Sequence, residues 1–397
     1  MKSARNWGRL GMKYKTNSLN CLADIQTGPF GSQLHNEDYV LEGTPIVTVE
    51  HLGEKNFKQQ NLPYVSDADK ERLSKYVLKP GDIVFSRVGS VDRCSYVSAK
   101  YDGWLFSGRC LRVRPNETLD PQYLYYYFCA EETKQFVRNI AVGATMPSIN
   151  TALLGQVQIS YPDIITQKKI VAILSALDEK IAINRAINDN LQQQAAALFS
   201  SLYDRSNTEV RFTDLIQILG GGTPKTGENT YWNGNIAFFT PKDVGTPYTL
   251  ITEKTISKEG LSHCNSRLYP VNTVFVTARG TVGKVGMSGV PMAMNQSCYA
   301  LVGKETHQLL VYFYTLKTVD RLKHKASGAV FDAITTRDFE SEQIMKLSDE
   351  DAKSFLCIAE PMFQKILNNS IENQRLSTLR DSLLPKLVSG EIDVSAV

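Results

Sequence analysis

Residues Ile170–Leu202, IVAILSALDEKIAINRAINDNLQQQAAALFSSL, form the most regular pattern of this chain. Its side chains form a ladder at alternating steps of four and three residues, interrupted by only two asparagines: Ile170, Leu174, Leu177, Ile181, Asn184, Asn188, Leu191, Ala195, Leu198 and Leu202. An average spacing of about 3.5 residues keeps one stripe of an α-helix facing a partner, as in a coiled coil. A helix of roughly 33 residues is about 50 Å long and cannot bury this stripe against itself.

The same ladder returns 185 positions later, asparagines included: Met362, Ile366, Asn369, Asn373, Leu376, Arg380, Leu383 and Leu387. Antiparallel pairing of the two helices sets Asn184 opposite Asn373 and Asn188 opposite Asn369. A buried asparagine is costly unless it finds a hydrogen-bonding partner, and such pairs fix register in coiled coils. We therefore predict an antiparallel coiled-coil pair with a pseudo-two-fold axis near its midpoint. The alternative is two unrelated amphipathic helices whose asparagines lie in water.

The regions before the two helices are also duplicated. Pro80–Val91 matches Pro270–Val282 with one residue inserted, and Ala141-Val-Gly-Ala matches Ala326-Ser-Gly-Ala at the same offset as the ladders. We expect an α/β (α+β) chain with two globular parts, 1–161 and 206–347, each followed by a long helix, 162–205 and 348–397. In the first part the predicted elements are strands 44–49, 82–85, 105–113 and 157–161, and a helix over 121–137 whose four tyrosines fill the core.

Composition narrows the class of protein. The chain has 397 residues and a net charge of +3, which permits nucleic-acid binding without requiring it. Its seven cysteines are scattered without a C-x-x-C pair, as is typical of reduced thiols in a cytoplasmic protein. Neither an apolar stretch of signal-peptide length near the N-terminus nor an apolar run of membrane-spanning length is found, so we expect no membrane association.

Motifs for catalysis are weak throughout. The stretch Gly280–Val285 has a glycine spacing too short for a phosphate-binding loop and no Ser or Thr after its lysine. Pro162-Asp163 with Asp178-Glu179-Lys180 resembles a metal-dependent nuclease set, but the last three residues fall on the ladder helix and are interpreted as a solvated charged face. The five histidines have no ligand spacing. We therefore expect no metal and no cofactor site in this chain.

Basic and amide side chains recur at matching turns of the two globular parts. Such groups pair with phosphates and with base edges in the major groove. Their recurrence favours DNA contact over a generic soluble surface. In the first part the candidates are Arg87, Ser90, Arg93, Arg109 and Arg112, with Lys55, Lys58 and Asn61 as weaker ones. In the second part they are Arg279, Thr281, Lys284, Asn295 and Gln296, with Lys225, Thr240 and Lys242 as weaker ones.

Over nearly its whole length the chain resembles the specificity (S) subunit of type I restriction-modification systems, HsdS. The motifs that carry the resemblance are Gly221-Gly-Thr-Pro-Lys, Tyr231-Trp-Asn-Gly, Phe239-Thr-Pro-Lys-Asp, Ala278-Arg-Gly-Thr-Val-Gly-Lys-Val, Gln167–Ile181 and Leu379–Glu391. The first part departs from the glycine-rich opening of the second and has Gly28-Pro-Phe-Gly-Ser instead. Contacts of one loop therefore need not transfer to the other.

The resemblance implies two target-recognition domains, each reading one half of a bipartite double-stranded DNA target, with the helices as a spacer between them. It further implies two modification (M) subunits that carry S-adenosylmethionine and methylate adenine at N6. Restriction (R) subunits would add translocation and cleavage driven by ATP and Mg. Two other interpretations remain: a single-chain DNA methyltransferase or nuclease on the same scaffold, and a structural adaptor that does not touch DNA.

Overall fold

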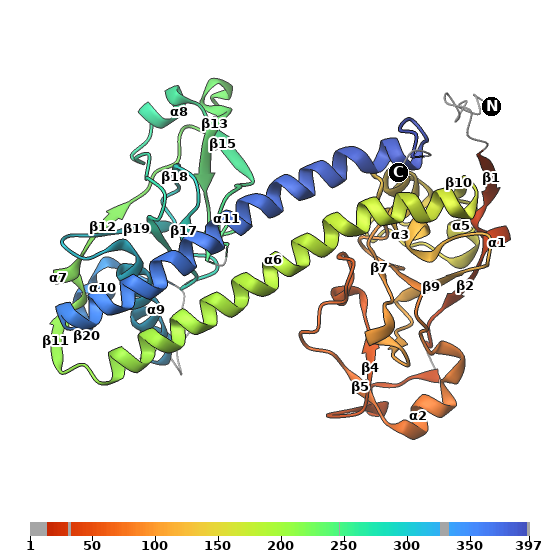
Figure 1. The fold of residues 1–397 in the computed structure, drawn as a ribbon, viewed down its shortest axis with the longest axis horizontal. Coiled ribbons are helices and arrows are strands. Elements are labelled where there is room, and N and C mark those ends of the chain that lie inside the picture. Colours follow the sequence, from red (N-terminus) through yellow and green to blue (C-terminus); the bar gives the residue numbers. More distant parts are fainter. Residues whose placement is uncertain (1–13, 31–32, 246, 326–332, 395–397) are drawn as a thin grey trace. The chain divides into compact units, whose positions relative to one another are not determined.

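The computed structural model describes residues 14–30, 33–245, 247–325 and 333–394 (Figure 1). It divides into two compact units, each with one globular part and portions of both long helices. Unit 1 is Met1–Glu179 with Leu376–Val397, and unit 2 is Lys180–Arg375. The helices, α6 (Ile164–Asp204) and α11 (Asp349–Val388), lie within the segments predicted for them. The repeated motif at 326–329, part of the motif at 28–32 and the first residues of the predicted domain 1–161 lie outside the described residues.

Unit 1 contains two four-stranded sheets, in the orders β2-β9-β6-β7 and β3-β5-β4-β8, and a ribbon of β1 with β10. Its strands are β1 (Lys15–Ser18), β2 (Ala23–Thr27), β3 (Tyr39–Val40), β4 (Thr44–Val47), β5 (Tyr64–Val65), β6 (Ile83–Ser86), β7 (Cys94–Tyr96), β8 (Leu105–Phe106), β9 (Cys110–Pro115) and β10 (Gln158–Tyr161). Its short helices are α1 (Leu19–Leu22), α2 (Asp67–Arg72), α3 (Pro121–Cys129), α4 (Glu131–Ile140) and α5 (Thr151–Leu154).

Unit 2 repeats this plan with sheets in the orders β12-β19-β16-β17-β14 and β15-β13-β18, and a ribbon of β11 with β20. Its strands are β11 (Thr208–Arg211), β12 (Ile216–Gly220), β13 (Trp232–Phe239), β14 (Tyr248–Thr249), β15 (Lys254–Ile256), β16 (Val274–Thr277), β17 (Val285–Ser288), β18 (Met292–Met294), β19 (Cys298–Gly303) and β20 (Gln343–Lys346). Its short helices are α7 (Phe212–Leu215), α8 (Lys258–Ser262), α9 (Gln308–Lys325) and α10 (Thr336–Ser341). The order β2-β9-β6-β7 thus returns as β12-β19-β16-β17, which confirms the duplication.

Two predicted elements need correction. The strand predicted over 105–113 is two strands, β8 and β9, which belong to different sheets because a turn at Ser107–Arg109 separates them. The helix predicted over 121–137 is broken at Ala130, where the backbone is extended. The four tyrosines of α3 are buried as predicted, in the core that also receives Ile170 and Leu174 of α6.

Each long helix begins at a polar cap. Asp163 accepts hydrogen bonds from the amides of Ile165 (3.0 Å) and Thr166 (3.1 Å), and so satisfies the first free N–H groups of α6. Ser348 is its counterpart in the repeat and accepts one from the amide of Asp351 (3.1 Å) at the start of α11. Asp163 therefore caps a helix. This role argues against the interpretation of Asp163 as the first acidic residue of a nuclease site.

Candidate nucleic-acid interface

Four loops of unit 2 meet at one end of its larger sheet. The amide of Asn295 donates to the carbonyl of Phe239 (3.0 Å), and the Thr281 hydroxyl donates to the carbonyl of Pro241 (3.1 Å). The amide of Gly222 donates to the carbonyl of Met294 (3.1 Å). These bonds join the loops 220–225, 239–243, 278–284 and 295–297, which we call the unit 2 loop cluster. The candidate residues of the second half thus gather at one place, as their recurrence at turns suggested.

The positive charges of the unit 2 loop cluster lie in water. The side chains of Lys225, Arg279 and Lys284 are exposed, and Lys242 is exposed with its Nζ 3.7 Å from Glu253 Oε2. A surface ion pair of this kind contributes little and is easily exchanged for a phosphate. Exposed cations beside one another are the groups that contact a nucleic-acid backbone.

Three polar candidates of this cluster shape the loops instead. Thr240 donates from its hydroxyl to Asp243 Oδ2 (2.6 Å), and Asn295 Oδ1 accepts from the amide of Ser297 (3.0 Å). The hydroxyl of Thr281 is used on Pro241 as described. Gln296 differs from these three candidates because its side chain is exposed and makes no loop-shaping contact of that kind. The hydroxyl of Thr223 donates to Gln296 Oε1 and so orients the side-chain amide. Thr223 was missed from the sequence.

The stretch Gly280–Lys284 is a turn between strands β16 and β17, with left-handed backbone at Gly280 (φ 85°) and Gly283 (φ 73°). A phosphate-binding loop would lead into a helix N-terminus. Here a strand follows, which excludes that interpretation.

Unit 1 builds a corresponding cluster, in which two backbone hydrogen bonds match those of unit 2. The amide of Ser107 donates to the carbonyl of Val47 (2.8 Å), as Asn295 does to Phe239. The amide of Arg87 donates to the carbonyl of Arg109 (2.8 Å), as Ala278 does to Ser297 (2.8 Å). We call the loops 28–30, 47–51, 86–93 and 107–110 the unit 1 loop cluster.

Two of the four arginine candidates of unit 1, Arg93 and Arg112, form contacts inside the domain. Arg112 lies on β9 with only 4% of its surface exposed and pairs with Asp24 on the adjacent strand β2. Burial lowers the pKa of Arg112, with a smaller contribution from Arg114. Arg93 donates to the carbonyl of Leu52. Both side chains thus have partners within the domain, and contact of either one with DNA stays a prediction.

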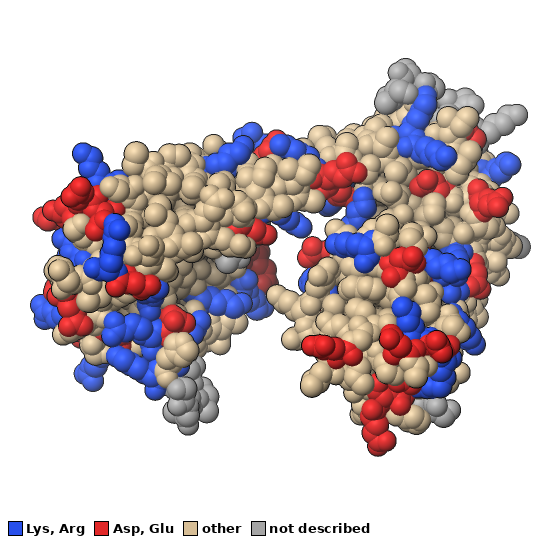
Figure 2. Space-filling model, turned by 60° about the horizontal axis from the view of Figure 1, so that its bottom comes forward, with Lys and Arg blue, Asp and Glu red and all other residues tan. Residues whose placement is uncertain are grey.

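Arg87, Ser90 and Arg109 remain at the surface of the unit 1 loop cluster. Ser90 and Arg109 are exposed. Arg87 is half-buried: its Nη1 donates to the carbonyl of Gly108 (3.3 Å) and its guanidinium lies 5.9 Å from the ring centre of Phe30. Phe30, which the sequence reasoning missed, is 61% exposed. On the face shown in Figure 2, basic and acidic side chains are interspersed rather than collected in one basic patch.

In unit 2 the helices α6 and α11 lie antiparallel with the predicted asparagines in contact. Asn184 Nδ2 donates to Asn373 Oδ1 (3.0 Å), and Asn369 Nδ2 donates to Asn188 Oδ1 (2.8 Å). Asn184 also donates to Glu372 Oε2 (2.7 Å), and this bond lowers the pKa of Glu372. The opposition predicted from the ladders is confirmed. That these contacts set the register remains a prediction.

In unit 1 the helices and the globular part meet at Asp178, whose side chain is only 14% exposed. Its two carboxylate oxygens accept from Tyr126 of α3 (2.6 Å) and from Arg380 of α11 (2.8 Å). Lys55 lies 3.7 Å from the same carboxylate and donates to the Tyr126 hydroxyl (2.9 Å). Burial lowers the pKa of Lys55. Asp178 is thus a joint between three elements and not part of a solvated face, and Lys55 is not free for DNA.

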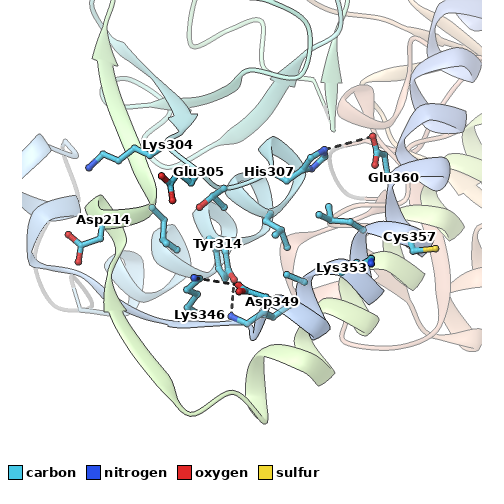
Figure 3. Close-up of a pocket in the computed structure, with 16 residues that line it drawn as sticks. Asp214, Lys304, Glu305, His307, Tyr314, Lys346, Asp349, Lys353, Cys357 and Glu360 are labelled. Carbon is cyan, nitrogen blue, oxygen red and sulfur yellow. Dashed lines mark hydrogen bonds and ion pairs between the residues drawn. The ribbon is translucent and has the colours of Figure 1, made fainter.

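A groove of about 970 Å³ opens in unit 2 beside the start of α11 (Figure 3). Ala352 lines this groove, and its counterpart in the repeat is the buried Gln167 of unit 1. The side-chain amide of Gln167 donates to the carbonyl of Pro162 (2.9 Å) and accepts from the amide of Asp120 (2.8 Å). The groove has opposite charges on its rim, such as Lys346 with Asp349 at 3.8 Å, and the described residues that line it include no nucleophile and base in contact.

Nothing in the described part of the chain offers a metal site, since no three His, Cys, Asp or Glu side chains there gather closely enough to hold an ion. None of the described helices combines the length and the apolar composition that crossing a bilayer requires.

Comparison with known proteins gives one consistent result. Residues 13–193 and 205–376 each match the model of the family described as type I restriction modification DNA specificity domain. The specificity subunit of type I restriction enzyme HindI from Haemophilus influenzae is 25% identical, over 80% of this chain and 88% of that protein. The MjaIX specificity subunit from Methanocaldococcus jannaschii is 23% identical over 71% of each.

The fold has a counterpart among solved structures. The S subunit of a type I restriction-modification system from M. genitalium superimposes with a TM-score of 0.60, covering 97% of this chain and 98% of that one at 15% identity. At this identity the likeness supports the fold alone.

Proposed function

We propose that this chain reads a bipartite, asymmetric DNA target. The proposal starts from its family: the chain belongs to the type I restriction-modification DNA specificity proteins and is a non-catalytic DNA-recognition subunit. The observation that carries the proposal is the pair of loop clusters, which share backbone hydrogen bonds but differ in the side chains they expose. Two equal scaffolds with unequal surfaces suit two half-targets of different sequence. Phosphate contacts would supply most of the affinity and base edges the specificity.

The two long helices are proposed to set the gap between the half-targets. Their polar layers, Asn184 with Asn373 and Asn188 with Asn369, oppose slippage because any other register would bury an asparagine against an apolar rung. A shift of one heptad, about 10 Å, would change the tolerated gap by about three base pairs of about 3.4 Å each.

The helices are also proposed to bind two M subunits, which would methylate adenine at N6. On α6 in unit 2, Ile183 and Ile187 lie one helical turn apart and are 55% and 38% exposed. Apolar side chains at this spacing are typical of a face that binds another helix. S-adenosylmethionine, ATP and Mg are proposed to reside on the M and R subunits, and the assembled complex to work in the cytoplasm.

A methylome of cells that express this chain with its M partner tests the proposal. We expect N6-methyladenine at one bipartite motif with a fixed gap. An Arg279→Ala variant should reduce methylation through one half of that motif only, since Arg279 belongs to the unit 2 loop cluster. Equal loss through both halves would contradict the assignment of one half-target to each unit. Binding of S-adenosylmethionine by the isolated chain would favour the single-chain methyltransferase instead.

A further inference from the structure

One position of each loop cluster is defined by a close backbone approach that the repeat has preserved. A Cβ added to Gly28 would lie 2.2 Å from the carbonyl oxygen of Ser107, and one added to Gly221 would lie 2.2 Å from that of Asn295. Only glycine fits so near another backbone. The two glycines therefore occupy equivalent places, and Phe30 and Thr223, each two residues later, are structural counterparts.

The residues facing these two positions are also counterparts. Gly108 follows Ser107 in unit 1, and Gln296 follows Asn295 in unit 2. In unit 2 the Thr223 hydroxyl donates to Gln296 Oε1. In unit 1 a Cβ at position 108 would be 2.7 Å from the Cβ of Phe30, so the aromatic side chain takes the space that Gln296 uses. Unit 2 thus presents the Gln296 amide, held by the Thr223 hydroxyl. Unit 1 presents the Phe30 ring beside Gly108, which has no side chain.

The surroundings of Phe30 favour contact with DNA over burial. The ring of Phe30 is 61% exposed and lies beneath the Arg87 guanidinium, at 5.9 Å from its ring centre. A cation above a ring holds it in place without covering its edge. Arg109, whose carbonyl binds the amide of Arg87, is exposed nearby. In the major groove, thymine methyl groups lie between the two phosphate backbones. The apolar ring is therefore suited to contact a methyl group while the neighbouring cations contact phosphates.

We infer that positions 30 and 296 are the base-reading positions of the two units: Phe30 contacts a thymine methyl group in one half-target, and Gln296, oriented by Thr223, bonds to a purine edge in the other. The inference rests on the proposed function and specifies its chemistry. The Gln296 amide keeps both Nε2 hydrogens and one lone pair of Oε1, which are the groups that pair with adenine N6 and N7.

Replacing thymine by deoxyuridine tests the first contact, because it removes only the methyl group. The complex of this chain with its M partner is assayed for methylation of duplexes carrying the motif found in the methylome, with uracil in one half-target at a time. The half that responds to Arg279→Ala identifies unit 2. We expect uracil in the unit 1 half to lower kcat/KM about fourfold, the value of one buried methyl-sized group.

Variants at position 30, combined with the change from thymine to uracil, form a double-mutant cycle. Phe30→Ala should lose a similar factor on thymine DNA and show no further loss with uracil, whereas Phe30→Leu should keep part of the preference for thymine. Phe136→Ala, which truncates another exposed phenylalanine of unit 1, is the matched control and should behave as the unchanged protein. An unaltered melting temperature of Phe30→Ala separates loss of contact from loss of fold.

Gln296→Ala tests the second contact. We expect the methylome motif to become degenerate at one base pair of the unit 2 half while the unit 1 half is unchanged. Equal methylation of thymine and uracil duplexes by the unchanged complex, or the same uracil penalty in Phe30→Ala, would overturn the assignment of Phe30. An unaltered motif in Gln296→Ala would overturn that of Gln296. The proposed function fails separately, if the unchanged complex yields no bipartite motif.

Discussion

The two globular parts join the same pair of helices by opposite chemistry. Asp178 in unit 1 binds Tyr126 and Arg380, whereas its counterpart 185 residues later in the repeat is Phe363. Phe363 is buried and packs its ring 5.5 Å from that of Phe313 on α9. A polar joint depends on every partner, because an ion that loses its partner remains partly buried. An aromatic joint depends on the apolar area in contact.

The same contrast holds for the loop clusters. Arg112 and Arg93 of unit 1 are used inside the domain, whereas Arg279 and Lys284 of unit 2 lie in water. A count of cations in the sequence therefore overstates the positive surface of unit 1. The duplication conserved the scaffold and left both the joint and the reading surface free to differ.

The largest effect is expected at the two joints. Asp178→Ala should lower the free energy of unfolding by about 3 kcal/mol, since Tyr126 loses its acceptor, Lys55 loses its ion pair, and Arg380 keeps only the exposed Asp381. Phe363→Ala should cost about as much, roughly 3–5 kcal/mol for a buried phenylalanine.

Urea unfolding in low and high salt distinguishes the polar joint from the aromatic joint. Only the effect of Asp178→Ala should shrink in about 1 M NaCl, where the screening length is about 3 Å. Asp189→Ala, an exposed acid on the same helix, is the control. Equal salt dependence of both variants would remove the distinction between the joints.

A second comparison separates inward from outward arginines. Arg112→Ala should lower the free energy of unfolding by about 2 kcal/mol, a value reduced because its partner Asp24 is itself exposed. Arg109→Ala, which truncates an exposed arginine of the unit 1 loop cluster, should leave stability unchanged and lower the slope of log affinity against log salt by about 0.9, the value of one phosphate contact. Thermal unfolding and DNA binding at several salt concentrations measure the two effects. The reverse pattern would show that the exposure of these side chains does not determine their roles.

The asparagine layers give a smaller effect. Asn369→Leu should cost about 1–2 kcal/mol, because Asn188 Oδ1 loses the bond from Asn369 in a buried layer. Adding Asn188→Leu should recover part of this stability and at the same time loosen the register. The methylome would then show more than one gap between half-targets. A single unchanged gap in the double variant would refute the register role of this layer.

The smallest expected effect is a difference in the reactivity of cysteine thiols. Burial raises the pKa of Cys110 in unit 1 and of Cys298 in unit 2 to about 12 each. Since the thiolate is the reactive form, both should resist alkylation of the folded protein at pH 8, whereas the exposed Cys21 and Cys357 should react. Mass spectrometry of the labelled peptides distinguishes them. Faster labelling of Cys110 than of Cys298 would indicate that unit 1 opens more readily at its loop cluster.

The sequence predicted the architecture well because its signals are periodic. Repetition of the ladder at a constant offset was enough to place Asn184 against Asn373 and Asn188 against Asn369, since spacing along a helix fixes the face on which a side chain lies. The ladder was less accurate away from the asparagine layers, where Phe199 and Phe363 are buried although neither is a rung. A straight helix drifts from a 3.5-residue repeat by about 20° per heptad.

The candidate surface was predicted only in part. The gathering of Arg279, Thr281 and Gln296 followed from their positions at matching turns. The signal for Phe30 and Thr223 was present in the sequence, as residues two places after Gly28 and Gly221, but the equivalence of these glycines became evident only from their contacts with Ser107 and Asn295.

The repeat, the helix pair and the opposition of the asparagines can be predicted from the sequence, because they depend on spacing along the chain. Which charges face outward depends on the folded structure. Arg112 and Asp24 are 88 residues apart in the chain, yet they lie side by side on strands β9 and β2. An arginine turns inward when a distant segment brings it a carboxylate or a carbonyl, and no local pattern records that partner.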